Sequence, residues 1–267
     1  MIPTRSASPQ RTTGARGVAS ARLVVALLAI AALAGGGYGA WYLFLRPAAP
    51  AAVGTPSAVT STATPSSAAS ESPATSSSGG SSGEVAGSWT VDPSIGSFDD
   101  FSGSFVGYRI REELAGVGAQ EAVGRTPAVT GTLTVDGTTL TAAEITADLS
   151  SLQSDDDRRD GQLRRQALET EQFPSASFTL ATPIDLGTLP TDGQTIHVEA
   201  SGSLTLHGQT RTVTIGLDAT RSGDALTVTG SLPIVLADYG IAKPSSFLVL
   251  SVAEEGTMEL QLHFRHA

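Results

Sequence analysis

The chain has 267 residues, 40% hydrophobic and 16% charged, and its lack of cysteine excludes disulfide frameworks, thiolate catalysis and cysteine zinc sites. The residues before Glu84 carry a net charge of +4, so the total of −10 leaves −14 on residues 84–267. A domain of that charge is repelled by nucleic acid, and we expect no nucleic-acid partner.

Residues 1–22 form a basic tail, and residues 23–45 form an apolar stretch without a charge. At 1.5 Å per residue the stretch spans about 34 Å, enough to cross a bilayer core of roughly 30 Å. Four arginines precede it and one follows it, which predicts a cytoplasmic N-terminus. A signal peptide cleaved after Ala32-Leu33-Ala34 is the alternative, although the apolar run continues for eleven more residues. We therefore expect a single-pass transmembrane helix in the cell membrane and an extracytoplasmic domain.

Residues 46–86 consist almost wholly of Ala, Pro, Ser, Thr and Gly. Such a segment cannot bury enough apolar surface to fold, which predicts a disordered linker. As a flexible coil it would reach roughly 35 Å, so the domain that follows could hover near the membrane or touch it.

Residues 87–267 contain repeated runs in which apolar and polar side chains alternate. This alternation predicts strands with one apolar and one polar face. Asp136-Gly137 and His207-Gly208 stand between such runs and predict tight hairpin turns. In the last run Met258, Leu260, Leu262 and Phe264 should face one way and the intervening polar residues the other. Many strands joined by short turns are typical of a sandwich or an up-and-down barrel.

One short helix interrupts the strands. Ser154 is the expected N-cap, with an acid three residues later, and acids suit the N-terminus of a helix. Leu163 and Ala167 follow at helical spacing. Phe173-Pro174 then restores an extended chain. The helix is either a surface connector or a lid over a barrel mouth.

Five motifs follow one another along this part of the chain: Trp89-Thr-Val-Asp92-Pro93, Gly131-Thr-Leu-Thr-Val135 with Asp136, the stretch 147–178 with its Arg159-Asp160 and Phe173-Pro174, Gly202-Ser-Leu-Thr-Leu-His-Gly208, and Asp238-Tyr239-Gly240. In this order they resemble the motifs of the YceI family, often described as lipid- or polyisoprenoid-binding. Two places depart from the family pattern. Ala167-Leu168 replace a pair of aromatics, and the strand Phe105-Val-Gly-Tyr108-Arg109 lacks the usual histidine.

The resemblance covers residues 87–267 and implies a lipocalin-like antiparallel β-barrel of about eight strands. It also implies an apolar cavity for one isoprenoid or similar long-chain lipid, without a cofactor. A barrel of this size either fills with side chains or holds one small ligand. The side chains that we expect at the cavity are Phe105, Tyr108, Leu149, Leu163, Phe173, Phe178 and Tyr239.

Other functions have less support in the sequence. The four histidines are placed poorly for a shared metal site, and no nucleophile–base pair is evident, so we expect neither a metal centre nor an enzyme. The arginines at 158, 159, 164 and 165 either pair with nearby acids or receive a phosphate headgroup. A surface or stress-response module with a filled core is the main alternative, a hydrolase or isomerase acting on lipid is a weaker one, and a homodimer stays open.

Overall fold

The computed structural model describes residues 49–53, 85–244 and 249–267. No helix in these ranges is long and apolar enough to cross a bilayer. The expected transmembrane helix at 23–45 lies outside the described residues, as does most of the expected linker.

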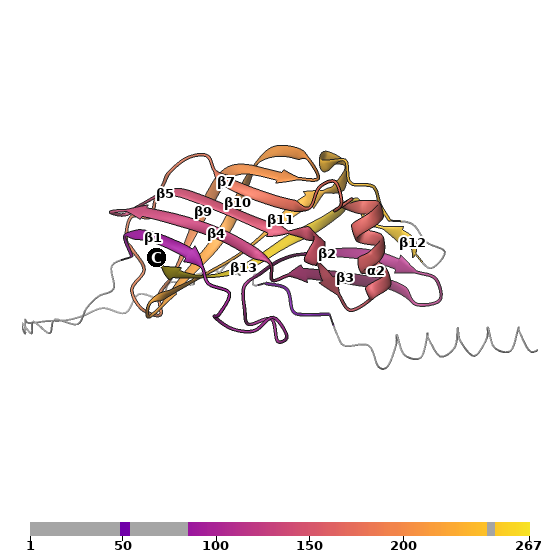
Figure 1. The fold of residues 1–267 in the computed structure, drawn as a ribbon, viewed down its shortest axis with the longest axis horizontal. Helices are drawn as coiled ribbons and strands as arrows, with labels where there is room; N and C mark the ends of the chain where they lie inside the picture. Colours follow the sequence, from indigo (N-terminus) through magenta and orange to yellow (C-terminus); the bar gives the residue numbers. More distant parts are fainter. Residues whose placement is uncertain (1–48, 54–84, 245–248) are drawn as a thin grey trace, which may run out of the picture. The chain divides into compact units, whose positions relative to one another are not determined.

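Eight antiparallel strands close into a barrel (Figure 1). Their order around the ring is β1, β4, β5, β7, β9, β10, β11 and β13, and β1 closes the ring by pairing with β13. The bounds are β1 Gly87–Val91, β4 Val129–Asp136, β5 Thr139–Asp148, β7 Ser175–Leu180, β9 Thr195–Leu206, β10 Gln209–Ser222, β11 Ala225–Val235 and β13 Glu255–His266. The expected all-β barrel of about eight strands is confirmed.

One end of the barrel has a different wall, because β13 changes partner along its length. Its C-terminal end pairs with β1, whereas residues 257–261 pair with β2. The additional strands are β2 Phe105–Leu114, β3 Gly118–Thr126, β6 Gln153–Ser154, β8 Ile184–Asp185 and β12 Val249–Val252.

Helix α2, Asp157–Gln162, lies at the β2–β3 end, opposite the C-terminus in Figure 1. It continues as a π-helical turn, η2, Leu163–Ala167. Two 3-10 turns, η1 Leu149–Ser151 and η3 Leu236–Tyr239, follow β5 and β11.

Turn chemistry sets the strand register. His207 and Gly208 form the two-residue turn between β9 and β10, and both have positive φ, at 50° and 70°. That pair of angles matches the twist of a tight hairpin, and glycine adopts it without strain. The β4–β5 turn is shifted by one residue from the expectation. Asp136 is still in the strand, paired with Thr139, and the turn is Gly137-Thr138.

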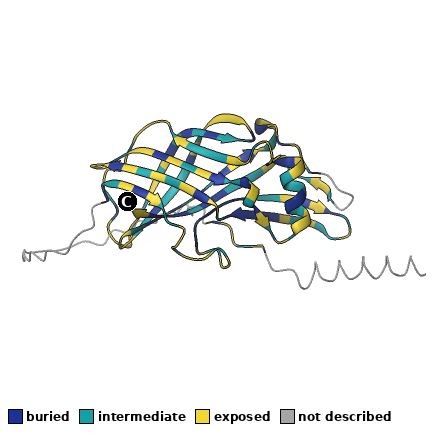
Figure 2. Cartoon of the chain, in the orientation of Figure 1, coloured by how far each residue is buried: buried dark blue, intermediate teal, exposed yellow. Residues whose placement is uncertain are grey.

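The apolar faces of the strands form two neighbouring hydrophobic clusters inside the barrel. Buried and exposed residues alternate along the strands (Figure 2). On β13 the inward set is the one that the alternation predicts, with Leu262 and Phe264 almost completely buried. The outward residues Glu259 and His263 are buried as well, because other segments cover this part of the outer wall.

Residues 49–53 belong to the expected linker, yet they contact the outer wall of the barrel. The backbone oxygen of Pro50 accepts a hydrogen bond of 2.7 Å from Arg109, and that of Ala51 accepts one of 2.9 Å from Arg125. Val53 is buried. Together with the loop before β2, these residues cover Arg109 of β2 and Arg125 of β3.

The N-cap of helix α2 differs from the expected one. Asp156, not Ser154, caps the helix, and its carboxylate accepts hydrogen bonds from the backbone N–H groups of Arg158 and Arg159. Ser154 instead donates to the buried carboxylate of Asp160, with its hydroxyl at 2.6 Å.

Removal of this cap should loosen the helix. An Asp156→Ala variant should lose about 1 kcal/mol of stability, because two N–H groups lose their acceptor. Hydrogen exchange of the amides in residues 158–167 measures the effect directly. Asp157→Ala is the matched control, since Asp157 is exposed and does not cap the helix. Equal exchange rates in the two variants would contradict the assigned cap.

Candidate functional site

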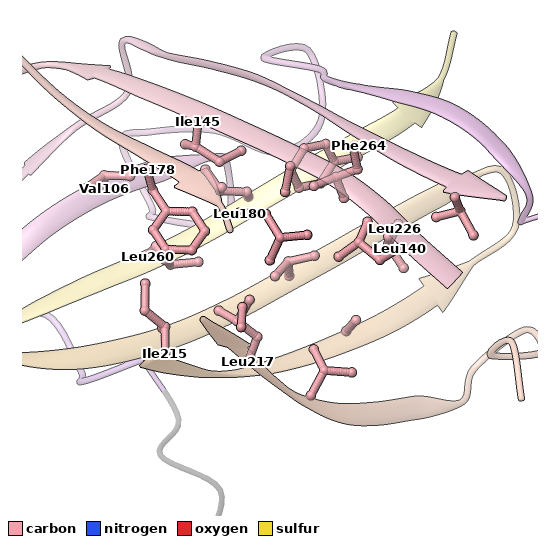
Figure 3. Close-up of a pocket in the computed structure, with 18 of the residues that line it drawn as sticks. Val106, Leu140, Ile145, Phe178, Leu180, Ile215, Leu217, Leu226, Leu260 and Phe264 are labelled. Atoms are coloured by element: carbon pink, nitrogen blue, oxygen red, sulfur yellow. The ribbon is translucent and has the colours of Figure 1, made fainter. Parts of the chain in front are cut away.

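The first cavity lies within the strand ring and is almost entirely apolar. Its volume is about 120 Å³, and among the described residues every one that lines it, except Ser177, is apolar. Seven strands of the ring, all but β1, contribute side chains, together with Val106 of β2. Figure 3 shows Ile145, Phe178 and Leu260 converging on this space. Other side chains around it are Leu140, Leu180, Ile215, Leu217, Leu226 and Phe264.

A second cavity lies at the end of the barrel that carries α2. Its volume is about 140 Å³, and it is lined by β2, the η1 and η3 turns, and the α2–η2 helix. Leu149, Leu163 and Leu168 supply apolar surface, but Tyr108, Glu112 and Arg159 also reach the cavity wall. The second cavity is therefore the one with polar chemistry.

Three residues line both cavities and so mark where they adjoin. They are Val106 of β2, Ala176 of β7 and Met258 of β13. We call them the septum. Alanine leaves space, and methionine is unbranched with three rotatable bonds, so these two residues of the septum can yield to a ligand. None of the three was among the side chains that the sequence predicted at the cavity.

The polar end of the second cavity is organised by an ion-pair network. Arg159 of α2 contacts Glu112 of β2 at 2.5 Å and Asp155 at 2.6 Å, and Glu112 is only 8% exposed. Asp160 is buried and accepts hydrogen bonds from Ser154. This network fastens the helix to the wall of the barrel. Of the other arginines considered as phosphate ligands, Arg164 donates to the backbone oxygen of Leu152.

The structure brings together four of the seven side chains expected at the cavity. Tyr108, Leu149 and Leu163 line the second cavity, and Phe178 lines the first. Whether these residues contact a lipid stays a prediction.

The other three expected side chains line neither cavity. Phe105 is 1% exposed on the outer face of β2, where the guanidinium of Arg125 lies 4.1 Å from its ring centre. Phe173 packs against His207, with the rings 4.5 Å apart. Tyr239 is buried in the hydrophobic cluster at the α2 end.

The described residues contain no group of three or more His, Asp or Glu side chains that could hold a metal ion. His207 has a structural environment. Its Nδ1 lies 3.0 Å from the backbone oxygen of Tyr239 and its Nε2 3.0 Å from Glu169. These contacts fasten the β9–β10 turn to η3.

Several solved structures resemble this barrel. A polyisoprenoid binding domain from Saccharophagus degradans, implicated in plant cell wall breakdown, is 18% identical with a TM-score of 0.52, over 67% of this chain and 98% of that one. BcnA of Burkholderia cenocepacia is 20% identical with a TM-score of 0.46, over 60% of this chain and 95% of that one. The Campylobacter jejuni YceI protein is 14% identical with a TM-score of 0.44, over 54% of this chain and 84% of that one. The first of these likenesses supports the fold.

Comparison with curated proteins gives no match. The sequence model of the YceI-like domain, in contrast, matches residues 89–264, which is nearly the whole barrel. All five motifs noted in the sequence lie in this range. The chain therefore belongs to the YceI-like domain family.

Proposed function

We propose that this protein binds a long-chain, isoprenoid-type lipid inside the barrel and carries or sequesters it at the outer face of the cell membrane. The first cavity carries this proposal, because Ser177 is its only polar lining residue within the part of the chain that the structure describes. The Saccharophagus domain of the same fold is described as polyisoprenoid-binding, which agrees with such a ligand.

The size of the cavities sets how a chain can fit. An apolar cavity of about 150 Å³ holds one benzene molecule, so each cavity accepts roughly six carbon atoms, about one isoprene unit. A longer chain needs both cavities, joined by displacement of the septum side chains. Each CH₂ group removed from water contributes about 0.8 kcal/mol, so binding requires no reactive group.

The membrane part of the proposal depends on the sequence. The apolar stretch at 23–45 anchors the protein, the arginine-rich tail stays in the cytoplasm, and the barrel is exported. An anchored carrier loads its lipid directly from the bilayer. The charge of the exported part disfavours adhesion to anionic headgroups, so the anchor keeps the domain at the membrane.

Native mass spectrometry tests this function. Full-length protein extracted from the membrane fraction in mild detergent should carry one long-chain amphiphile for each barrel. Lipid extraction and mass analysis then identify the ligand. Repeated recovery of empty barrels that do not take up added polyprenyl lipids would contradict lipid binding. Recovery of the intact chain only from the cytosol would contradict the anchored location.

A further inference from the structure

Tyr108 lines the second cavity, and its buried hydroxyl has no hydrogen-bond partner within the described part of the chain. A buried polar group without a partner costs free energy, so such groups are rare in folded proteins. Burial is the main cause that raises the pKa of Tyr108 above its ordinary value, which keeps the hydroxyl protonated. The group can therefore both donate and accept a hydrogen bond.

The polar groups nearby are already engaged with one another. Arg159 contacts Glu112 and Asp155, and Asp160 accepts from Ser154. Gly124 of β3 leaves room for the Tyr108 side chain, since a Cβ there would lie 2.4 Å from Cε1 of the Tyr108 ring and 3.0 Å from its hydroxyl oxygen. A partner for the hydroxyl is thus expected from a ligand in the cavity.

The charges around this end limit what the ligand can be. Two arginines line the second cavity, and each already faces two carboxylates. Arg109 contacts Glu121 and Glu259, the second of which it shares with Arg125. Arg159 contacts Glu112 and Asp155. A phosphate group would have to displace carboxylates from these arginines and would then lie among the released acids.

We infer that the ligand is an uncharged lipid with a terminal hydroxyl, a long-chain alcohol, and that this hydroxyl binds to Tyr108. The inference rests on the lipid-binding function proposed above and names the class of lipid. The alcohol group lies in the second cavity and the hydrocarbon chain passes the septum into the first. A phosphorylated form of the same lipid is excluded by the acids around Arg159.

The test compares two probes that share one hydrocarbon chain. Delipidated full-length protein in detergent is titrated with geraniol and with geranyl monophosphate, whose two isoprene units match the two cavities. The alcohol should bind at least tenfold more tightly. Tyr108→Phe should weaken binding of the alcohol about two- to twelvefold, the range for one hydrogen bond. Tyr239→Phe is the matched control and should leave the affinity unchanged, because Tyr239 lines neither cavity.

A folding measurement accompanies the titration. The empty Tyr108→Phe protein should unfold at the same urea concentration as the parent or at a higher one, because the variant removes an unpaired buried hydroxyl. A lower midpoint would reveal a structural partner for the hydroxyl and overturn the inference.

The remaining outcomes separate the inference from the function on which it rests. Equal or tighter binding of the monophosphate overturns the inference but leaves lipid binding intact. Unchanged affinity of Tyr108→Phe for the alcohol overturns the assigned contact. Failure of both probes to bind contradicts lipid binding itself.

Discussion

An Ala143→Phe variant should fold and yet lose nearly all affinity for a long-chain lipid. Ala143 of β5 is 7% exposed and lines the first cavity. A phenyl ring is about as large as the benzene molecule that fills an apolar cavity of about 150 Å³, so it would occupy this space. The ligand would lose the burial of five or six carbon atoms, each of which contributes about 0.8 kcal/mol to the free energy of binding. The total loss of roughly 4 kcal/mol corresponds to an affinity about a thousandfold lower.

The neighbouring residue gives the control. Ala142 is exposed on the outer face of the same strand, so Ala142→Phe makes the same chemical change without entering the cavity. Both variants are purified in full length, titrated with geraniol and unfolded in urea. Overpacking typically lowers the free energy of unfolding by 1–3 kcal/mol. Because the cavity has room for the ring, the loss for Ala143→Phe should be near the lower value. A folded Ala143→Phe protein that binds lipid as tightly as the Ala142→Phe protein would place the ligand elsewhere.

Local patterns were sufficient to predict the strands and the inward faces of several of them. On β13 the strict alternation from Met258 to Phe264 identifies the cavity side without reference to any other strand. The hairpin at His207-Gly208 follows from two residues that tolerate positive φ. Both are local effects, determined by the pleat of one strand or by the geometry of one turn.

The assignment of side chains to the cavity needed information that no single strand contains. Phe105 is aromatic and buried, but its neighbour Val106 is the residue that faces the cavities. A one-residue change of register reverses every side chain of a strand, and here the outer face is also buried. The cover consists of residues 49–53 and the loop before β2, and neither resembles a core element in the sequence. The septum was missed for a similar reason, because it forms only where three strands distant in sequence meet.

Neutralisation of Glu259 should cause the largest loss of stability on the outer wall. Its carboxylate is 2% exposed and contacts Arg109 at 2.9 Å and Arg125 at 3.2 Å. Arg125 is itself 3% exposed and lies over the rings of Phe101 and Phe105. A Glu259→Gln variant retains the shape but leaves buried positive charge without compensation, which typically costs 3–5 kcal/mol. The free energy of unfolding in urea should fall by about this amount.

Two further variants distinguish a buried charge from a general weakness of the strand. Glu255→Gln, at an exposed position of the same strand, should change stability by less than about 0.5 kcal/mol. Glu259→Leu combined with Arg125→Met should recover much of the loss, because an apolar pair of similar volume carries no desolvation penalty. If the free energy of unfolding of Glu259→Gln fell by less than about 1 kcal/mol, water would have to reach Arg109 and Arg125. Residues 49–53, whose carbonyl groups at Pro50 and Ala51 accept hydrogen bonds from the same two arginines, would then fail to shield them.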